Sequence, residues 1–288
     1  MLPPVRRIAL PAALIAALVV VLSGCGEESG TTNREGQAAI SRYRAYLEKS
    51  ADELVTWLGQ LRARVAAGDV PGAQSRFASS RVPYGHLEPA AVLFDLDARM
   101  DGRPGAAVSA RSPGYDGLEH ALWSDAGTRN AIRPASRLLA SARELRQRVG
   151  GAPLPPGEIV GAARQVLDDV VRVELRGLES PYAHIDVADT AADVEGAEAA
   201  FDAVKPLLEA EDAELTAALE RRFAAAFRTL SDFGVLARSP EQQRIDSPGT
   251  SFVLFTVRSP AEIANLRQRV EAVARLLAQA EEVRRAGS

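Results

Sequence analysis

The sequence predicts an all-α protein built of two packed helical bundles. Apolar residues recur every three or four positions over long stretches, and 47% of the chain is apolar. The clearest run of glycine and proline lies in the middle of the chain, at residues 150–157. Helical periodicity on both sides of one such break is typical of two bundles, each with an apolar face to bury. We therefore expect a first bundle over residues 37–149, a linker over 150–157 and a second bundle over 158–288.

The first segment, residues 1–24, has the pattern of an export signal. Two arginines precede an apolar run over residues 8–22, which ends in Leu-Ser-Gly-Cys25. As a helix this run is about 22 Å long, too short for the roughly 30 Å hydrocarbon core of a bilayer. The pattern predicts a lipoprotein signal with Cys25 as the acylated residue, so that lipid holds the protein to the membrane. The protein would then be exported and lipid-anchored, at the outer face of the cytoplasmic membrane or in the periplasm.

The charge balance excludes one class of partner. Removing residues 1–24 takes away two of the 34 basic residues and leaves 32 against 38 acidic ones, a net charge of −6. A negative chain is a poor ligand for nucleic acid, so we expect no nucleic-acid partner. Residues 25–36 are polar, rich in glycine and without periodicity, which predicts a flexible tether.

The first bundle is predicted from amphipathic stretches and the breaks between them. A long helix over residues 38–67 stops at Gly-Asp-Val-Pro71, where the next helix starts. That helix runs to Leu93, and its two internal prolines, Pro83 and Pro89, are expected to bend or break it. Glycine and proline make residues 97–113 a loop. Further helices are expected from residue 115 past 123 and over 132–149.

In the second bundle, helical periodicity is clearest over residues 260–286, where valine, leucine and isoleucine form one face. Residues 252–257, Phe-Val-Leu-Phe-Thr-Val, have strand character, but a lone strand has no partner, so we interpret them as a buried connection. The other helices of this half are expected over residues 158–178, 191–210 and 211–236.

Residues 81–123 gather carboxylates at helical spacings, close to two histidines and among prolines and aromatics. Asp116 and Glu119 lie three positions apart, on one helix face, where they repel unless a cation or proton lies between them. An alternative that requires no metal is that the negative charge of Asp116 interacts favourably with the helix dipole at a helix start. The acids of this stretch are Glu88, Asp97, Asp101, Asp116 and Glu119.

Three motifs in this stretch resemble the imelysin-like family, in particular the iron-uptake lipoproteins of the EfeM/EfeO type. They are Tyr84-Gly-His-Leu-Glu88-Pro, Asp97-Ala-Arg-Met-Asp101-Gly-Arg103, and Gly-Tyr-Asp116-Gly-Leu-Glu119-His-Ala-Leu-Trp. The family pattern has a histidine where this chain has Asp116, and a glutamate where it has Gly85. The resemblance extends over roughly residues 38–285.

The resemblance implies a metal site. Its ligands would be Glu88, Asp101, Asp116 and Glu119, and aspartate in place of histidine should shift preference toward harder ions. The metal would be iron, as Fe²⁺ or Fe³⁺, or another divalent ion. A lone histidine such as His86 is otherwise more typical of a surface or core edge. The residues placed around the ligands, as a second layer or an opposite wall, are Tyr84, His86, Arg103, Tyr182 and Asp186.

The role implied is a metal-binding component of an Efe-type iron uptake system, which captures iron and presents it to a membrane permease or a peroxidase-like partner. The sequence contains no His-Glu-x-x-His, Gly-x-Ser-x-Gly or phosphate-binding loop, so we expect no enzyme activity. The alternative is a surface scaffold or interaction lipoprotein that keeps the fold but has lost the metal, which the changes at Gly85 and Asp116 favour.

Overall fold

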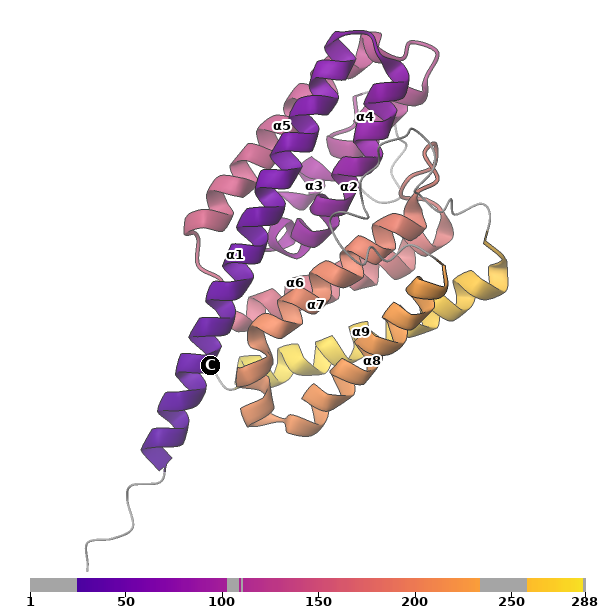
Figure 1. Cartoon of the computed structure of the whole chain (residues 1–288). Coiled ribbons are helices and arrows are strands. Elements are labelled where there is room, and N and C mark those ends of the chain that lie inside the picture. Colours follow the sequence, from indigo (N-terminus) through magenta and orange to yellow (C-terminus); the bar gives the residue numbers. More distant parts are fainter. Residues whose placement is uncertain (1–24, 103–108, 110, 234–257, 287–288) are drawn as a thin grey trace, which may run out of the picture.

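Every regular element in the described part of the chain is helical, which confirms the all-α prediction (Figure 1). The computed structural model describes residues 25–102, 109, 111–233 and 258–286, so the predicted signal and the segment 252–257 lie outside the described residues. The elements are α1 (Cys25–Ala66), α2 (Val70–Leu93), α3 (Asp97–Met100), α4 (Gly114–Trp123), α5 (Thr128–Gly151), α6 (Pro156–Arg172), η1 (Glu174–Arg176), α7 (Asp186–Glu211), α8 (Ala213–Asp232) and α9 (Pro260–Ala286).

The first bundle is formed by α1 to α5. Helix α1 packs along α2 and α5, and α4 packs on α5 (Figure 1). Leu47, Leu54, Leu58 and Leu61 of α1 are completely buried, which is the face that the three-and-four spacing predicts. The short helix α3 lies inside the stretch expected to be a loop and brings the chain back against α2.

The second bundle consists of α6 to α9, and it shares its core with the first. Helix α6 packs on α7 and α9, while α8 packs on the same two helices (Figure 1). Helix α7 also contacts α1 and α2 of the first bundle. The buried apolar side chains form one continuous cluster from Tyr43 to Ala280. The connection between the bundles is residues 152–155, shorter than the predicted linker because its outer residues extend α5 and α6.

The predicted tether over residues 25–36 is helical, since α1 begins at Cys25. Extending an existing helix adds one hydrogen bond for each residue fixed, so a formed helix continues through residues that would not start one. Gly36 lies against Leu207 of α7: a Cβ on this glycine would be 2.6 Å from the leucine side chain. The second bundle therefore already contacts α1 at Gly36, two residues before the predicted start of the helix.

Helix α2 is continuous through Pro83 and Pro89, so neither proline breaks it into pieces. Asp69 caps its start by accepting a hydrogen bond from the Gly72 N–H at 2.9 Å. Packing compensates for the missing proline N–H groups, because α1, α6 and α7 surround this helix and bury most of its length. As a result, α2 lies between the bundles, where its polar side chains face α7.

Candidate metal site

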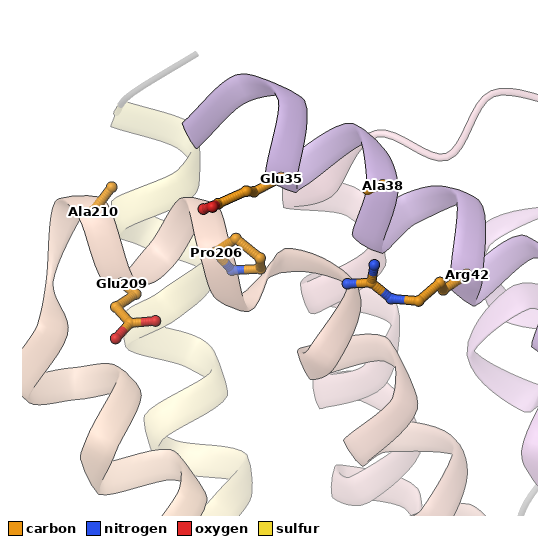
Figure 2. Close-up of a pocket in the computed structure, with 6 residues that line it drawn as sticks. All are labelled: Glu35, Ala38, Arg42, Pro206, Glu209 and Ala210. Atoms are coloured by element: carbon orange, nitrogen blue, oxygen red, sulfur yellow. The ribbon is translucent and has the colours of Figure 1, made fainter. Parts of the chain in front are cut away.

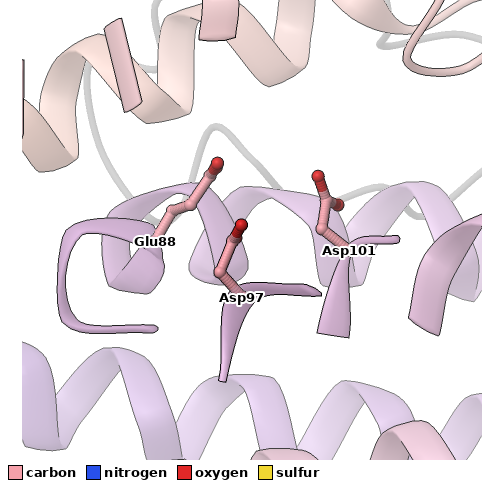
Figure 3. Close-up of side chains that lie close together, drawn as sticks. All are labelled: Glu88, Asp97 and Asp101. Atoms are coloured by element: carbon pink, nitrogen blue, oxygen red, sulfur yellow. The ribbon is translucent and has the colours of Figure 1, made fainter. Parts of the chain in front are cut away.

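Three carboxylates of the first bundle converge beside α2. One oxygen from each of Glu88, Asp97 and Asp101 lies within 4.8 Å of the other two, and the side chains point to one side (Figure 3). Glu88 comes from the last turns of α2, whereas the two aspartates lie at the two ends of α3. The Tyr84 hydroxyl donates a hydrogen bond to Asp97 Oδ1 at 2.9 Å. This spacing suits oxygen ligands around a single cation.

The second bundle adds further acids to this cluster. Asp193 is in hydrogen-bonding contact with Glu88 and with Glu174, and Glu179 is in such contact with Asp101. Glu174 also accepts a hydrogen bond from the Thr190 hydroxyl at 2.7 Å. Together with Asp189 of α7, which shares Arg81 with Asp101 and Glu179, we refer to these acids as the acidic cluster. Its members are Glu88, Asp97, Asp101, Glu174, Glu179, Asp189 and Asp193.

Arg81 is the basic residue that the acidic cluster surrounds, and it is only 3% exposed. Its guanidinium pairs with Asp101, with Glu179 at 3.1 Å and with Asp189 at 3.2 Å. The same group lies 4.8 Å from the centre of the Tyr115 ring, close enough for a cation–π interaction. A fixed positive charge thus offsets part of the negative charge that the two bundles bring together.

Burial raises the pKa values of these acids, because a low dielectric disfavours the charged form. The pKa of Asp97 rises to about 7 through burial and the neighbouring Asp101, and that of Asp189 rises to about 6 through burial. Burial also moves the pKa values of Glu88 and Asp193 well above their usual range, with neighbouring carboxylates adding to the effect. At neutral pH the acidic cluster therefore needs protons or a further cation.

Two of the predicted ligands, Asp116 and Glu119, lie outside the group of three convergent carboxylates. Glu119 is 1% exposed, but its carboxylate accepts the backbone N–H groups of Tyr182 at 3.1 Å and Ala183 at 2.7 Å. Asp116 lies outside the Glu88, Asp97 and Asp101 group, because its carboxylate packs against Gly102, where a Cβ would be 1.9 Å from Asp116 Oδ2. Both residues sit beside the cluster, on α4.

Among the residues predicted to surround the ligands, Tyr84 contacts Asp97, whereas His86 and Asp186 contact other groups. His86 Nε2 pairs with Glu195 Oε2 at 2.7 Å, since two positions along a helix turn it about 200° from Glu88. Asp186 caps the chain before α7 by accepting the N–H groups of Glu179 and Ser180. Tyr182 is 41% exposed. Arg103 lies outside the described residues.

Sequence reasoning missed Arg81 and the acids of the second bundle. The available signal was a stripe at Asp186, Asp189 and Asp193, spaced i, i+3 and i+7 in a stretch rich in alanine and valine. Such a stripe marks one helix face, but it is typical of a solvated face as much as of a buried one. Asp97 begins the family motif that ends at Arg103, but it was not among the predicted ligands.

A surface groove lies far from these acids. It is a solvent-open groove of about 440 Å³ between α1 and the end of α7 (Figure 2). Pro206, at its edge, is 13 residues beyond Asp193 on α7, about 20 Å at 1.5 Å per residue. The groove therefore takes no part in the acidic cluster. Its lining residues are Glu35, Ala38, Arg42, Pro206, Glu209 and Ala210.

Comparison with known proteins places the chain in a family. The family model described as imelysin matches residues 39–280. The chain is 29% identical over 228 residues to the iron uptake system component EfeM of Pseudomonas syringae, covering 77% of this chain and 80% of that protein. It is 31% identical over 206 residues to the iron uptake system component EfeO of Escherichia coli and Shigella flexneri, covering 68% of this chain and 55% of those proteins. With most of its length matched, the chain belongs to the imelysin family.

Proposed function

We propose that this protein is the lipid-anchored, extracytoplasmic metal-binding component of an Efe-type iron uptake system. It captures iron and presents it to a membrane permease or a peroxidase-like partner, and the iron is cargo. The observation that carries the proposal is the convergence of Glu88, Asp97 and Asp101 to within 4.8 Å. The names of the EfeM and EfeO relatives support the choice of iron. Capture and presentation need no chemical step, so we propose no enzyme activity despite the peptidase label of the family model.

The donor chemistry of the three acids favours hard ions. Carboxylate oxygens suit Fe³⁺, Mn²⁺, Mg²⁺ and Ca²⁺ better than they suit Cu²⁺ or Zn²⁺, which prefer imidazole or thiolate. His86 turns away to Glu195 and so leaves the convergent group purely carboxylate among the described residues. We therefore expect binding of Fe³⁺ to be tighter than binding of Zn²⁺.

Asp97→Asn is expected to weaken iron binding at least tenfold, about 1.4 kcal/mol, because it replaces an anionic ligand with a neutral one. The Tyr84 hydroxyl can still donate to the amide oxygen, so the fold should be unaffected. The measurement is calorimetric titration of the purified protein with Fe³⁺ citrate, with anaerobic Fe²⁺ and with Zn²⁺ and Cu²⁺. Asp95→Asn is the matched control: Asp95 is exposed, two residues away, and has φ +56°, a conformation that asparagine tolerates.

One observation favours the second candidate, a scaffold lipoprotein that has lost the metal. Arg81 already pairs with Asp101 inside the acidic cluster and supplies one positive charge without any metal. Titration separates the two candidates. If the folded protein binds none of these ions at millimolar concentration, the scaffold function stands and metal capture is refuted.

Cys25→Ser is expected to release the protein from membranes or to leave it unprocessed, because serine cannot carry the thioether-linked lipid. The support for this anchor is the Leu-Ser-Gly-Cys25 motif after an apolar run. No helix in the described ranges has the length and hydropathy to cross a bilayer. Cell fractionation with metabolic palmitate labelling tests the anchor. A variant that is cleaved normally and still fractionates with membranes would show that the anchor is wrong.

A further inference from the structure

Arg81 lies on the same face of α2 as one of the three convergent acids. Arg81, Tyr84 and Glu88 are spaced i, i+3 and i+7, which places them in a row along one side of the helix. The Tyr84 ring lies 5.5 Å from the Arg81 guanidinium, and its hydroxyl donates a hydrogen bond to Asp97 Oδ1. One helix face thus carries a cation, a convergent acid and a tyrosine that contacts another of these acids.

The Arg81 side chain is fixed where it lies and has no route to solvent. It is 3% exposed, and its guanidinium pairs with Glu179 at 3.1 Å and with Asp189 at 3.2 Å. The Tyr115 ring lies 4.8 Å from the guanidinium. The hydroxyl of Tyr115 holds this ring by donating to the Ser80 carbonyl oxygen at 3.1 Å. With these contacts in place, a metal ion that arrives nearby meets a positive charge that stays in position.

Asp101 is the residue that a metal and Arg81 would share. It offers one oxygen to the 4.8 Å group with Glu88 and Asp97, and it also forms an ion pair with Arg81. A carboxylate paired with a guanidinium offers less charge to a second cation. Two positive charges also repel each other with an energy proportional to the product of the charges. A metal held by the three acids would therefore bind against the charge of Arg81.

We propose that Arg81 lowers the metal affinity of the three acids by competing for Asp101, which keeps a captured ion exchangeable. In the empty protein the guanidinium supplies positive charge to the acids. In the loaded protein it repels the ion, and it repels a trivalent ion more than a divalent one. This inference rests on the proposed metal capture and concerns the release of the ion. Arg81 acts through Asp101 and through its charge, and it does not ligate the metal.

The test is Arg81→Gln, which keeps a polar side chain and removes the charge. Calorimetry at pH 7.5 on the full-length protein in detergent measures affinity for Mn²⁺ and for Fe³⁺ citrate. Mn²⁺ should bind at least tenfold more tightly than to wild type. Fe³⁺ should gain at least about thirtyfold, because the logarithm of the gain scales with ion charge as 3 to 2. Arg81→Lys keeps the charge and should show no such gain.

Arg99→Gln is the matched control for the loss of one positive charge. Arg99 lies between Asp97 and Asp101 in α3, but its side chain is 53% exposed and pairs with Glu144 at 2.6 Å. Water and salt screen an exposed charge, so Arg99→Gln should bind both ions like wild type.

The outcomes separate this inference from the proposed function. If wild type binds the ions and Arg81→Gln binds them equally or more weakly, the inference is wrong and metal capture survives. If neither protein binds either ion, both are wrong. Binding by Arg81→Gln alone would support the competition and refute capture by the native chain. A purely structural role for Arg81 would loosen the site and weaken binding, which is the opposite sign.

A second pair of variants covers a failure of Arg81→Gln to fold. Arg81→Gln combined with Asp189→Asn also neutralises an acid that the first change leaves without its arginine. The double variant is then compared with Asp189→Asn alone, so that the difference reports Arg81. Tighter binding of both ions by the double variant supports the inference, and equal or weaker binding overturns it.

Discussion

Arg81→Ala should destabilise the protein by about 3–5 kcal/mol, the usual effect of removing one partner from a buried ion pair. The guanidinium is 3% exposed and pairs with Asp101, Glu179 and Asp189. Without it, three carboxylates lose their positive partner in a low-dielectric environment. Urea unfolding at pH 7.5, followed by circular dichroism, measures this loss. It should shrink at pH 5, where the unpaired acids take up protons and no longer need the arginine.

A surface ion pair provides the comparison for Arg81. Arg146 pairs with Asp52, and both side chains are more than half exposed. Arg146→Ala should therefore leave the urea midpoint nearly unchanged. If Arg81→Ala behaves like Arg146→Ala at pH 7.5, the guanidinium does not hold the acidic cluster together.

Metal-free protein is expected to be more stable at pH 5 than at pH 7.5. The pKa of Asp97 is raised to about 7, that of Glu119 to about 7 and that of Asp189 to about 6, in each case chiefly by burial. Unfolded carboxyls titrate near pH 4. Between about pH 4 and 7 the folded state therefore binds more protons than the unfolded state. Stability is greatest below this window and falls as pH rises through it, by about 1.4 kcal/mol per pH unit for each extra proton.

Urea midpoints at pH 5, 6 and 7.5 measure this trend. Asp97→Asn should flatten the curve, since it removes one of the groups responsible. A saturating hard cation should reverse the trend, because the metal then takes the place of the protons and competes better as pH rises. Stability that increases from pH 5 to 7.5 in the metal-free wild type would mean that the buried acids do not bind these protons.

The helices were predictable because their signal is local and repeated. Leu47, Leu54 and Leu58 are buried as their spacing requires, and the break at 150–157 contains the connection between the bundles. The tether prediction failed, since helix extension and packing on Leu207 depend on partners that lie far away in the sequence.

Only part of the acidic cluster could be predicted from the sequence, again because its other members come from distant segments of the chain. Glu88 and Asp101 follow from motifs in one segment, whereas Asp193 reaches them through the contact of α2 with α7. Gly85 illustrates the difference. In the sequence, Gly85 indicates that a carboxylate of the family pattern has been lost. In the fold, the absence of a side chain on Gly85 leaves space for the carboxylate of Asp193. Arg81 gave no signal, because an arginine within a helix is usually exposed.

Because α1 begins at Cys25, the segment expected to be a flexible tether is part of one long, stiff helix. Its 42 residues measure about 63 Å at 1.5 Å per residue, and its first turns extend away from both bundles (Figure 1). A flexible tether would let the protein sweep a broad volume above the bilayer, whereas a stiff one fixes its height and limits its tilt. With a lipid on Cys25, the acidic cluster would stay in a narrow layer parallel to the membrane. Iron would then be delivered by lateral diffusion in two dimensions, to any receiver whose entrance lies at the same height.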